Sequence, residues 1–213
     1  MTRRIVYSLG LLLATACTAM TLASIIIPKW ITGSSDSRGE QSYGLHKRCF
    51  SSTGSCDPFP QKRDCRDDKW GFCSMWRTVG FLMSLAVVVE LCTLVAFVVI
   101  IAGGVQRRSA GWKLQCSLLL FSSFIQCIGM AIVSFLFSHD EKFSSGWYLD
   151  SSWTLCTVSW TLLFLTGLGI TASALSLPEE GDYELIPDRF YGTEVEEDQL
   201  RSRVNSWMND SDE

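Results

Sequence analysis

Four long runs of apolar residues divide the chain, and most polar and charged residues collect between them. The runs predict helices over residues 5–27, 79–102, 114–138 and 152–177. The first run holds 23 residues without a charge, and at about 1.5 Å per residue it would cross a hydrocarbon core of about 30 Å. A soluble helix would show a polar face at a period of about 3.6 residues, which these runs lack. The pattern predicts a membrane protein with four transmembrane helices.

The first run has an alternative interpretation as a cleaved signal peptide. Arg3 and Arg4 would form its basic start, and Ala14-Thr15-Ala16 resembles a cleavage site. The apolar part of a signal peptide spans about 7–15 residues, and this run continues well beyond that. We therefore expect a retained first helix.

Charge separates the chain into two domains. Of its 213 residues, those from 177 to 213 hold 12 acidic and 3 basic side chains, whereas the rest hold 10 acidic and 15 basic ones. Residues 1–177 are expected to form the membrane domain, and residues 178–213 a disordered acidic tail. In the tail, Tyr183-Glu184-Leu185-Ile186 has the form of a sorting signal read by a clathrin adaptor, with Tyr183 and Ile186 as the side chains bound.

The number of spans, four, places both termini on one side of the membrane. Positive charges beside the first helix and between the second and third favour the cytoplasm for that side: Arg3, Arg4, Arg107, Arg108 and Lys113. The loop over residues 28–78 carries nine Lys and Arg of its own, which argues the other way. The four cysteines of this loop decide the predicted orientation. An even number of cysteines in a short polar stretch indicates disulfides, which need an oxidising compartment, so we place the loop outside the cell.

These four loop cysteines are the disulfide candidates: Cys49, Cys56, Cys65 and Cys73. The alternative is a zinc site, but the loop has no CxxC pair and its one histidine is His46. We therefore predict no metal and no cofactor, a plasma-membrane location, and cytoplasmic termini.

The order of these elements resembles the claudin and peripheral myelin protein superfamily of four-span proteins. The residues that carry the resemblance are Trp30 early in the loop, Gly44 and Leu45 ahead of Cys49, then Cys56, and Arg77 near the second helix. His46 stands where the family has Trp, the gap of six residues between the two cysteines is short, and Cys65 and Cys73 are additional. These departures point to a divergent, fungal-type claudin-like branch.

The resemblance implies an all-α membrane fold. It would be a left-handed four-helix bundle with a small extracellular β-sheet in the first loop, clipped by a disulfide. Residues 31–33 and 41–45 can form short strands, and residues 51–55 can form the turn between Cys49 and Cys56. The pairing of Cys65 and Cys73 stays open.

Glu90 is the one charged residue in the second predicted helix, and no Lys, Arg or His lies within the runs to pair with it. A carboxylate at that depth is either protonated or hydrogen-bonded to polar partners such as Gln115, Gln126 or a Ser or Thr. It could form an ion or proton site, or fix helix packing through a neutral hydrogen bond. We favour packing.

No catalytic constellation, glycine-rich phosphate loop or nucleic-acid motif is present in the sequence, so we expect no enzyme. The predicted function is a membrane protein that organises a membrane domain or cell contact by self-assembly and loop interactions. An auxiliary subunit or sensor for a channel, receptor or wall-signalling complex is the alternative, and a paracellular-type pore is a third. The expected partners are the lipid bilayer, further copies of the chain or other membrane proteins, and an adaptor at the tail.

Overall fold

The computed structural model describes residues 2–35, 39–61, 64–65, 71–103, 111–140, 143 and 146–176, and the structural statements below concern these residues. Its four long helices are α1 (Thr2–Ile26), α2 (Phe72–Ala102), α4 (Trp112–His139) and α5 (Ser151–Ser176). Each is long and apolar enough to cross a membrane, which confirms the prediction of four candidate spans.

The second helix begins at Phe72, earlier than the expected Val79. The preceding turns contain polar residues such as Arg77, so they fall outside the apolar run. They nevertheless have a buried apolar face, since Phe72 and Trp76 are 2% and 0% exposed. Packing on this face extends the helix beyond the apolar run.

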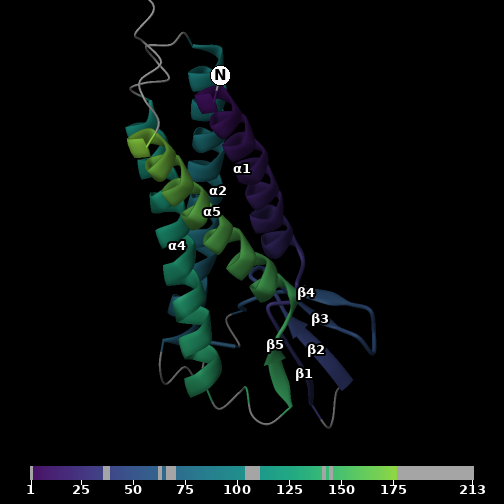
Figure 1. Cartoon of the computed structure of the whole chain (residues 1–213). Helices are drawn as coiled ribbons and strands as arrows, with labels where there is room; N and C mark the ends of the chain where they lie inside the picture. Colours follow the sequence, from purple (N-terminus) through teal and green to yellow (C-terminus); the bar gives the residue numbers. More distant parts are fainter. Residues whose placement is uncertain are drawn as a thin grey trace, which may run out of the picture. The chain divides into compact units, whose positions relative to one another are not determined.

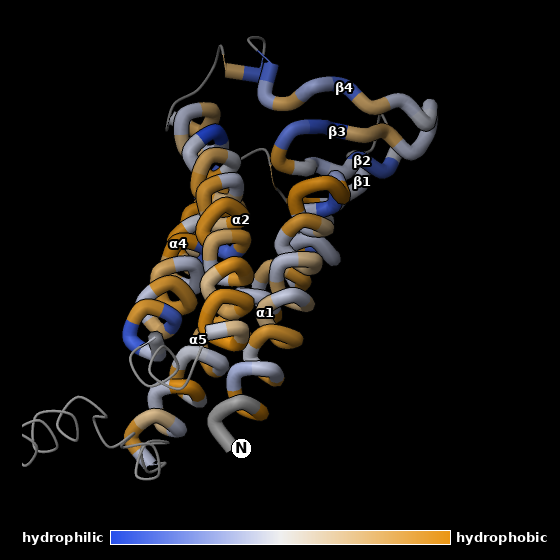
Figure 2. Tube along the Cα trace, turned by 90° about the horizontal axis from the view of Figure 1, so that it is seen from above, coloured by the Kyte–Doolittle hydropathy of each residue, from blue (hydrophilic) through white to orange (hydrophobic). Residues whose placement is uncertain are grey.

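The helices pack in a ring, in which α1 and α4 each contact both α2 and α5. Their outward faces carry large exposed apolar side chains, for example Phe81 and Val95 on α2 and Phe124 on α4. Figure 2 shows the apolar character running along the helices, while the strands are more hydrophilic. Such extended apolar surface is what lipid contact requires.

A five-stranded antiparallel sheet lies at one end of the bundle, and the N-terminus lies at the other (Figure 1). Its strands are β1 (Ile31–Ser35), β2 (Gly39–Tyr43), β3 (Lys47–Phe50), β4 (Cys56–Pro58) and β5 (Trp147–Leu149), in the spatial order β4-β3-β2-β1-β5. The expected strands in the first loop are therefore present, with residues 51–55 between β3 and β4.

The strand β5 was not predicted, because it comes from the segment between α4 and α5 and has only three residues, too few for a periodicity signal. It pairs antiparallel with β1, so that Gly33 lies opposite Trp147. A Cβ atom at Gly33 would overlap the indole ring of Trp147. Glycine at this position therefore leaves room for the ring beside β1, and the pairing of β1 with β5 joins the two loops into one sheet.

Aromatic side chains fill the junction between the sheet and the bundle. The ring of Tyr43 lies 5.0 Å from that of Phe59 and 5.4 Å from that of Trp147. Phe72 stacks on Trp76 at 5.5 Å at the start of α2. Ring contacts of this kind stabilise beyond their buried area, so the sheet packs on the helix ends through its own apolar core.

Candidate functional site

A carboxylate lies inside the bundle, where it is shielded from both lipid and water. Glu90 of α2 is 1% exposed. Its Oε1 lies 3.1 Å from the hydroxyl of Thr21 on α1 and 3.4 Å from that of Ser122 on α4, and it accepts a hydrogen bond from Nε2 of Gln126 on α4. A charged side chain without partners at this depth costs about 3 kcal/mol or more. Hydrogen-bond donors from two neighbouring helices offset that cost.

The fourth helix joins the same network through Ser159. Its hydroxyl lies 2.9 Å from that of Thr21 and donates to the backbone oxygen of Cys17 at 3.1 Å. Thr21 and Ser159 are both fully buried. We call the five side chains that meet here the polar core cluster: Thr21, Glu90, Ser122, Gln126 and Ser159. The cluster connects all four helices, so it fixes their relative positions.

The chemistry available to the polar core cluster is narrow. Oε2 of Glu90 is buried and has no hydrogen-bond partner, and no basic side chain contacts the carboxylate within the described residues. In the part of the chain that the structure describes, no three His, Cys, Asp or Glu residues gather to hold a metal. The arrangement can position helices by hydrogen bonds, and it offers no acid–base pair.

Gln115 was grouped with Glu90 and Gln126 on the sequence, but the structure places it elsewhere. It is fully buried, and its Nε2 donates to the backbone oxygen of Thr93 at 3.3 Å. Gln126 does reach Glu90. Thr21 and Ser159 were missed as individual partners, because the predicted helices contain many Ser and Thr and nothing in their spacing marks these two.

The loop cysteines form two disulfides, Cys49–Cys56 and Cys65–Cys73. Cys49 and Cys56 face each other across β3 and β4, so the first bond clips that hairpin. Cys73 lies in the first turn of α2 and Cys65 lies in the segment after β4. The second bond therefore ties the end of the sheet to the second helix.

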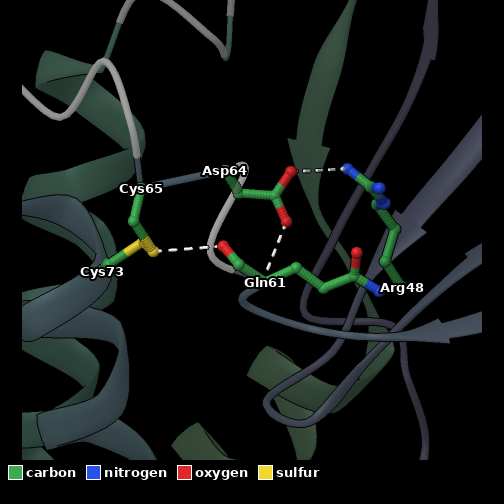
Figure 3. A network of polar contacts seen from close by, with 5 residues as sticks. All are labelled: Arg48, Gln61, Asp64, Cys65 and Cys73. Atoms are coloured by element: carbon green, nitrogen blue, oxygen red, sulfur yellow. Dashed lines mark hydrogen bonds and ion pairs between the residues drawn. A yellow bond between two sulfur atoms is a disulfide. The ribbon is translucent and has the colours of Figure 1, made fainter.

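An ion pair reinforces this connection (Figure 3). Arg48 on β3 is nearly buried, and its guanidinium donates to Oδ1 of Asp64 at 3.4 Å, while Oδ2 of Asp64 accepts from the backbone N–H of Gln61 at 3.0 Å. The guanidinium also lies 5.8 Å from the ring centre of Tyr43 and 5.1 Å from that of Phe50. Asp64 directly precedes Cys65, so the ion pair and the disulfide hold adjacent residues.

The remaining residues of the predicted loop motif lie at the junction of sheet and helices. The indole N–H of Trp30 donates to the backbone oxygen of Ser24 at 2.7 Å, and that of Trp76 donates to Leu45 at 3.3 Å. A Cβ atom at Gly44 would lie 2.5 Å from Cα of Pro28, so only glycine permits this approach. These residues hold the first loop against the bundle. Arg77 is exposed and lies within α2 rather than before it.

A groove runs along the outer face of the bundle between α4 and α5. It has a volume of about 470 Å³ and is lined by Leu120, Phe121, Ser123, Phe124, Cys127, Trp160 and Phe164. Phe121, Phe124 and Phe164 are 53%, 63% and 42% exposed. Its floor is closed by Ser123, whose hydroxyl donates to the backbone oxygen of Trp160 at 3.1 Å. We call this the α4–α5 groove.

The sorting-signal residues Tyr183 and Ile186, with the whole predicted tail, lie outside the described residues. The five remaining cysteines are not in disulfides. Cys17, Cys116 and Cys156 are buried among the helices, whereas Cys92 and Cys127 are exposed on the outer faces of α2 and α4.

Comparison with known proteins corrects the resemblance drawn from the loop motif. The family model that matches the chain, over residues 8–175, is that of lipoma HMGIC fusion partner-like protein, and a claudin or peripheral myelin protein model does not match. The claudin assignment was therefore wrong: Trp30, Gly44, Leu45 and the first disulfide arise from how a sheet is held on a four-helix bundle, and they do not identify a claudin. No curated protein matches the chain. Since the matched residues span more than half of its length, the chain belongs to the lipoma HMGIC fusion partner-like family, a family of four-span membrane proteins that are not known as enzymes.

Proposed function

We propose that this protein is a non-enzymatic auxiliary subunit, which binds another membrane protein side by side in the bilayer. The observation that carries the proposal is the α4–α5 groove, an apolar, aromatic-lined recess on the outer surface of two membrane helices. We propose a transmembrane helix of the partner as its occupant. Leu120, Phe124 and Cys127 follow one another at helical spacing along α4, with Trp160 and Phe164 opposite them on α5.

A partner helix suits this groove better than a second copy of the chain. In a two-fold contact between copies, the same surface meets itself. Two copies of the same recess placed face to face would not fill each other as a convex helix would. Helix association in lipid depends on close packing, since apolar burial alone gives no driving force there. A helix with small side chains along one stripe would fill the hollow.

The test is site-specific photocrosslinking in intact cells. A photoreactive side chain replaces Phe124 in the groove or, as a matched control, Val95 on the exposed face of α2. We expect the same partner to be captured from Phe124 and not from Val95, with the adduct mapping to a transmembrane segment of that partner. Phe164→Ala should weaken the capture because it removes one wall of the groove.

Other results of the same experiment would contradict the proposal. Adducts made only to lipid, or to a second copy of the chain, would show that the groove does not hold a partner helix. Capture that is unchanged in Phe164→Ala would place the contact outside the groove. Self-assembly into a membrane domain or cell contact, and a paracellular-type pore, are the functions that these other results would favour.

We further propose that the protein lies in the plasma membrane with both termini in the cytoplasm and the sheet outside. The two disulfides, Cys49–Cys56 and Cys65–Cys73, support this orientation, because such bonds persist in oxidising compartments. The exposed turn between β3 and β4 offers a test: Ser51→Asn creates a glycosylation acceptor ahead of Ser52 and Thr53. Glycan attachment would support an outside sheet, and its absence in a folded, surface-delivered variant would contradict it.

A further inference from the structure

The sheet formed by the described residues has two edge strands, and they differ in how well they are protected. At one edge, β4 carries Asp57 and Pro58. Charge and proline are common means by which proteins prevent a further strand from pairing with a sheet edge. At the opposite edge, β5 has the sequence Trp147-Tyr148-Leu149, with neither charge nor proline. The side of β5 that faces away from β1 is therefore the less protected one, and we call it the open edge.

The backbone of β5 presents hydrogen-bonding groups to the open edge. The N–H of Asp150 donates to the backbone oxygen of Trp30, on the β1 side, at 3.1 Å. Successive residues of a strand direct their N–H and C=O groups to opposite sides, so the backbone of Tyr148 also faces β1. The backbone groups of Trp147 and Leu149 then point to the open edge, where no other strand of the described residues pairs with them.

The side chains of β5 add a contact surface beside these backbone groups. Trp147 and Leu149 are partly buried and pack against the apolar core at the junction of sheet and helices. Tyr148 points to the other face of the strand, since side chains alternate, and it is 52% exposed. An added strand would therefore meet backbone donors and acceptors at the edge and an aromatic ring beside it.

The open edge lies on the side of the bundle that carries the α4–α5 groove. Around the ring of helices, α5 lies between α1 and α4. β1 follows α1 and β5 precedes α5, so the step from β1 to β5 leads from α1 towards α4 (Figure 1). Trp160 in the groove is nine residues from Ser151 at the start of α5, which is about 14 Å along the helix. A helix in the groove would thus reach the sheet after roughly ten further residues.

We propose that the open edge binds a short extended segment of the partner protein, which pairs with β5 as an added strand. This inference rests on the proposed function, because the segment is the continuation, on the sheet side of the membrane, of the helix in the α4–α5 groove. The N–H and C=O groups of Trp147 and Leu149 bond to the backbone of the segment, and the ring of Tyr148 contacts its side chains. Backbone pairing then supplies affinity, and the side-chain contact supplies selectivity.

Photocrosslinking in intact cells tests the added strand, with the full-length protein carrying a photoreactive side chain in place of Tyr148. Ser55, exposed in the turn between β3 and β4, is the matched control position. We expect Tyr148 to capture the same partner as Phe124 in the groove, and Ser55 not to capture it. The adducts from Tyr148 should lie roughly ten to fifteen residues from the membrane site reached from Phe124. They should fall on alternate residues, as in a strand.

Leu149→Pro tests the backbone pairing, because proline has no N–H and that of Leu149 points to the open edge. It should lower the capture from Tyr148 roughly fivefold, the effect of one lost backbone hydrogen bond. Capture from Phe124 should persist, which also verifies that the variant is folded and delivered. Leu149→Ala is the matched control, since it removes the side chain but keeps the N–H, and it should leave the capture from Tyr148 near that of the wild type.

The two proposals fail in different ways. Capture from Phe124 but not from Tyr148 would overturn the added strand and leave the proposed function standing, whereas loss of capture at both positions would overturn both. Adducts from Tyr148 only to lipid or to a second copy, adducts spaced three or four residues apart as in a helix, or equal capture in Leu149→Pro and Leu149→Ala would each overturn the pairing. Should Leu149→Pro not reach the cell surface, the spacing of the adducts in the otherwise unchanged protein decides the question.

Discussion

Replacing Glu90 by Leu tests whether the polar core cluster stabilises the bundle. Leu removes Oε1, which receives the contacts of Thr21, Ser122 and Gln126. Hydrogen bonds between helices in a membrane contribute about 0.6 kcal/mol each on average. Losing three therefore costs about 2 kcal/mol, and the buried amide of Gln126 keeps its longer contact of 3.4 Å with the hydroxyl of Thr21.

Replacing Glu90 by Gln should cost much less. Its amide oxygen takes the place of Oε1, and its amide nitrogen takes the place of Oε2, which has no partner in the structure. We expect Glu90→Gln to stay within about 0.5 kcal/mol of wild type, since its hydrogen bonds are retained. The comparison separates hydrogen bonding from charge, because Leu and Gln both remove the carboxylate and only Gln keeps an acceptor.

The measurement is unfolding of the full-length protein in mixed micelles by titration with sodium dodecyl sulfate, followed by tryptophan fluorescence. Trp30 and Trp76 are fully buried at the junction with the sheet and report on tertiary packing. Val95→Leu is the control on the exposed face of the same helix and should leave the free energy of unfolding unchanged. A Leu variant as stable as the Gln variant and the wild type would refute the packing role. A Gln variant as unstable as the Leu variant would instead show that the carboxylate itself is needed.

Three further outcomes are expected. Serine at both Cys65 and Cys73 should lower the free energy of unfolding by about 2.5 kcal/mol in the loop-closure treatment, measured by thermal unfolding under non-reducing conditions; an unchanged midpoint would contradict the anchoring role of this bond. Gly33→Ala should destabilise the sheet by about 1–3 kcal/mol, because a Cβ there overlaps the indole ring on β5; Gly169→Ala, with open space around its Cβ, is the control, and equal effects would argue against the contact. Tyr183→Ala should raise the pool at the cell surface, measured by surface biotinylation, if an adaptor reads the tail; unchanged uptake would count against that signal.

The membrane helices were predictable because apolar runs of this length, with so few charges, are rarely found outside membrane spans. The first and last residues of an apolar run show where the chain becomes apolar. A helix can begin before that run or continue after it. At the start of α2, Arg77 lies within the helix because Phe72 and Trp76 provide a buried face against the sheet. Hydropathy averaged over a window of residues does not reveal a buried apolar face on a helical turn that also carries polar residues.

The polar core cluster was predictable in part. Glu90 was recognised because a carboxylate in an apolar run is rare and costly. Which residues contact Glu90 depends on which face of each helix turns inward. Gln115 and Gln126 were both predicted as partners, but Gln126 contacts Glu90 and Gln115 contacts Thr93. Thr21 was not singled out, because a hydroxyl is common in membrane helices and satisfies its own helix backbone. The periodicity of a sequence can indicate which face of one helix is buried. The polar core cluster depends in addition on how the buried faces of four helices pack against one another.

The nine Lys and Arg of the first loop favoured a cytoplasmic loop, whereas its four cysteines favoured an extracellular one. The folded structure changes how much the charge count means. A count of positive charge assumes that each Lys or Arg faces solvent near the membrane surface. Arg48 does not, because it is nearly buried and paired with Asp64. Lys29, Lys47 and Arg77, by contrast, are exposed. The count of positive charge therefore includes a residue that the folded loop withdraws from the surface, and the two disulfides become the stronger guide to the side on which the sheet lies.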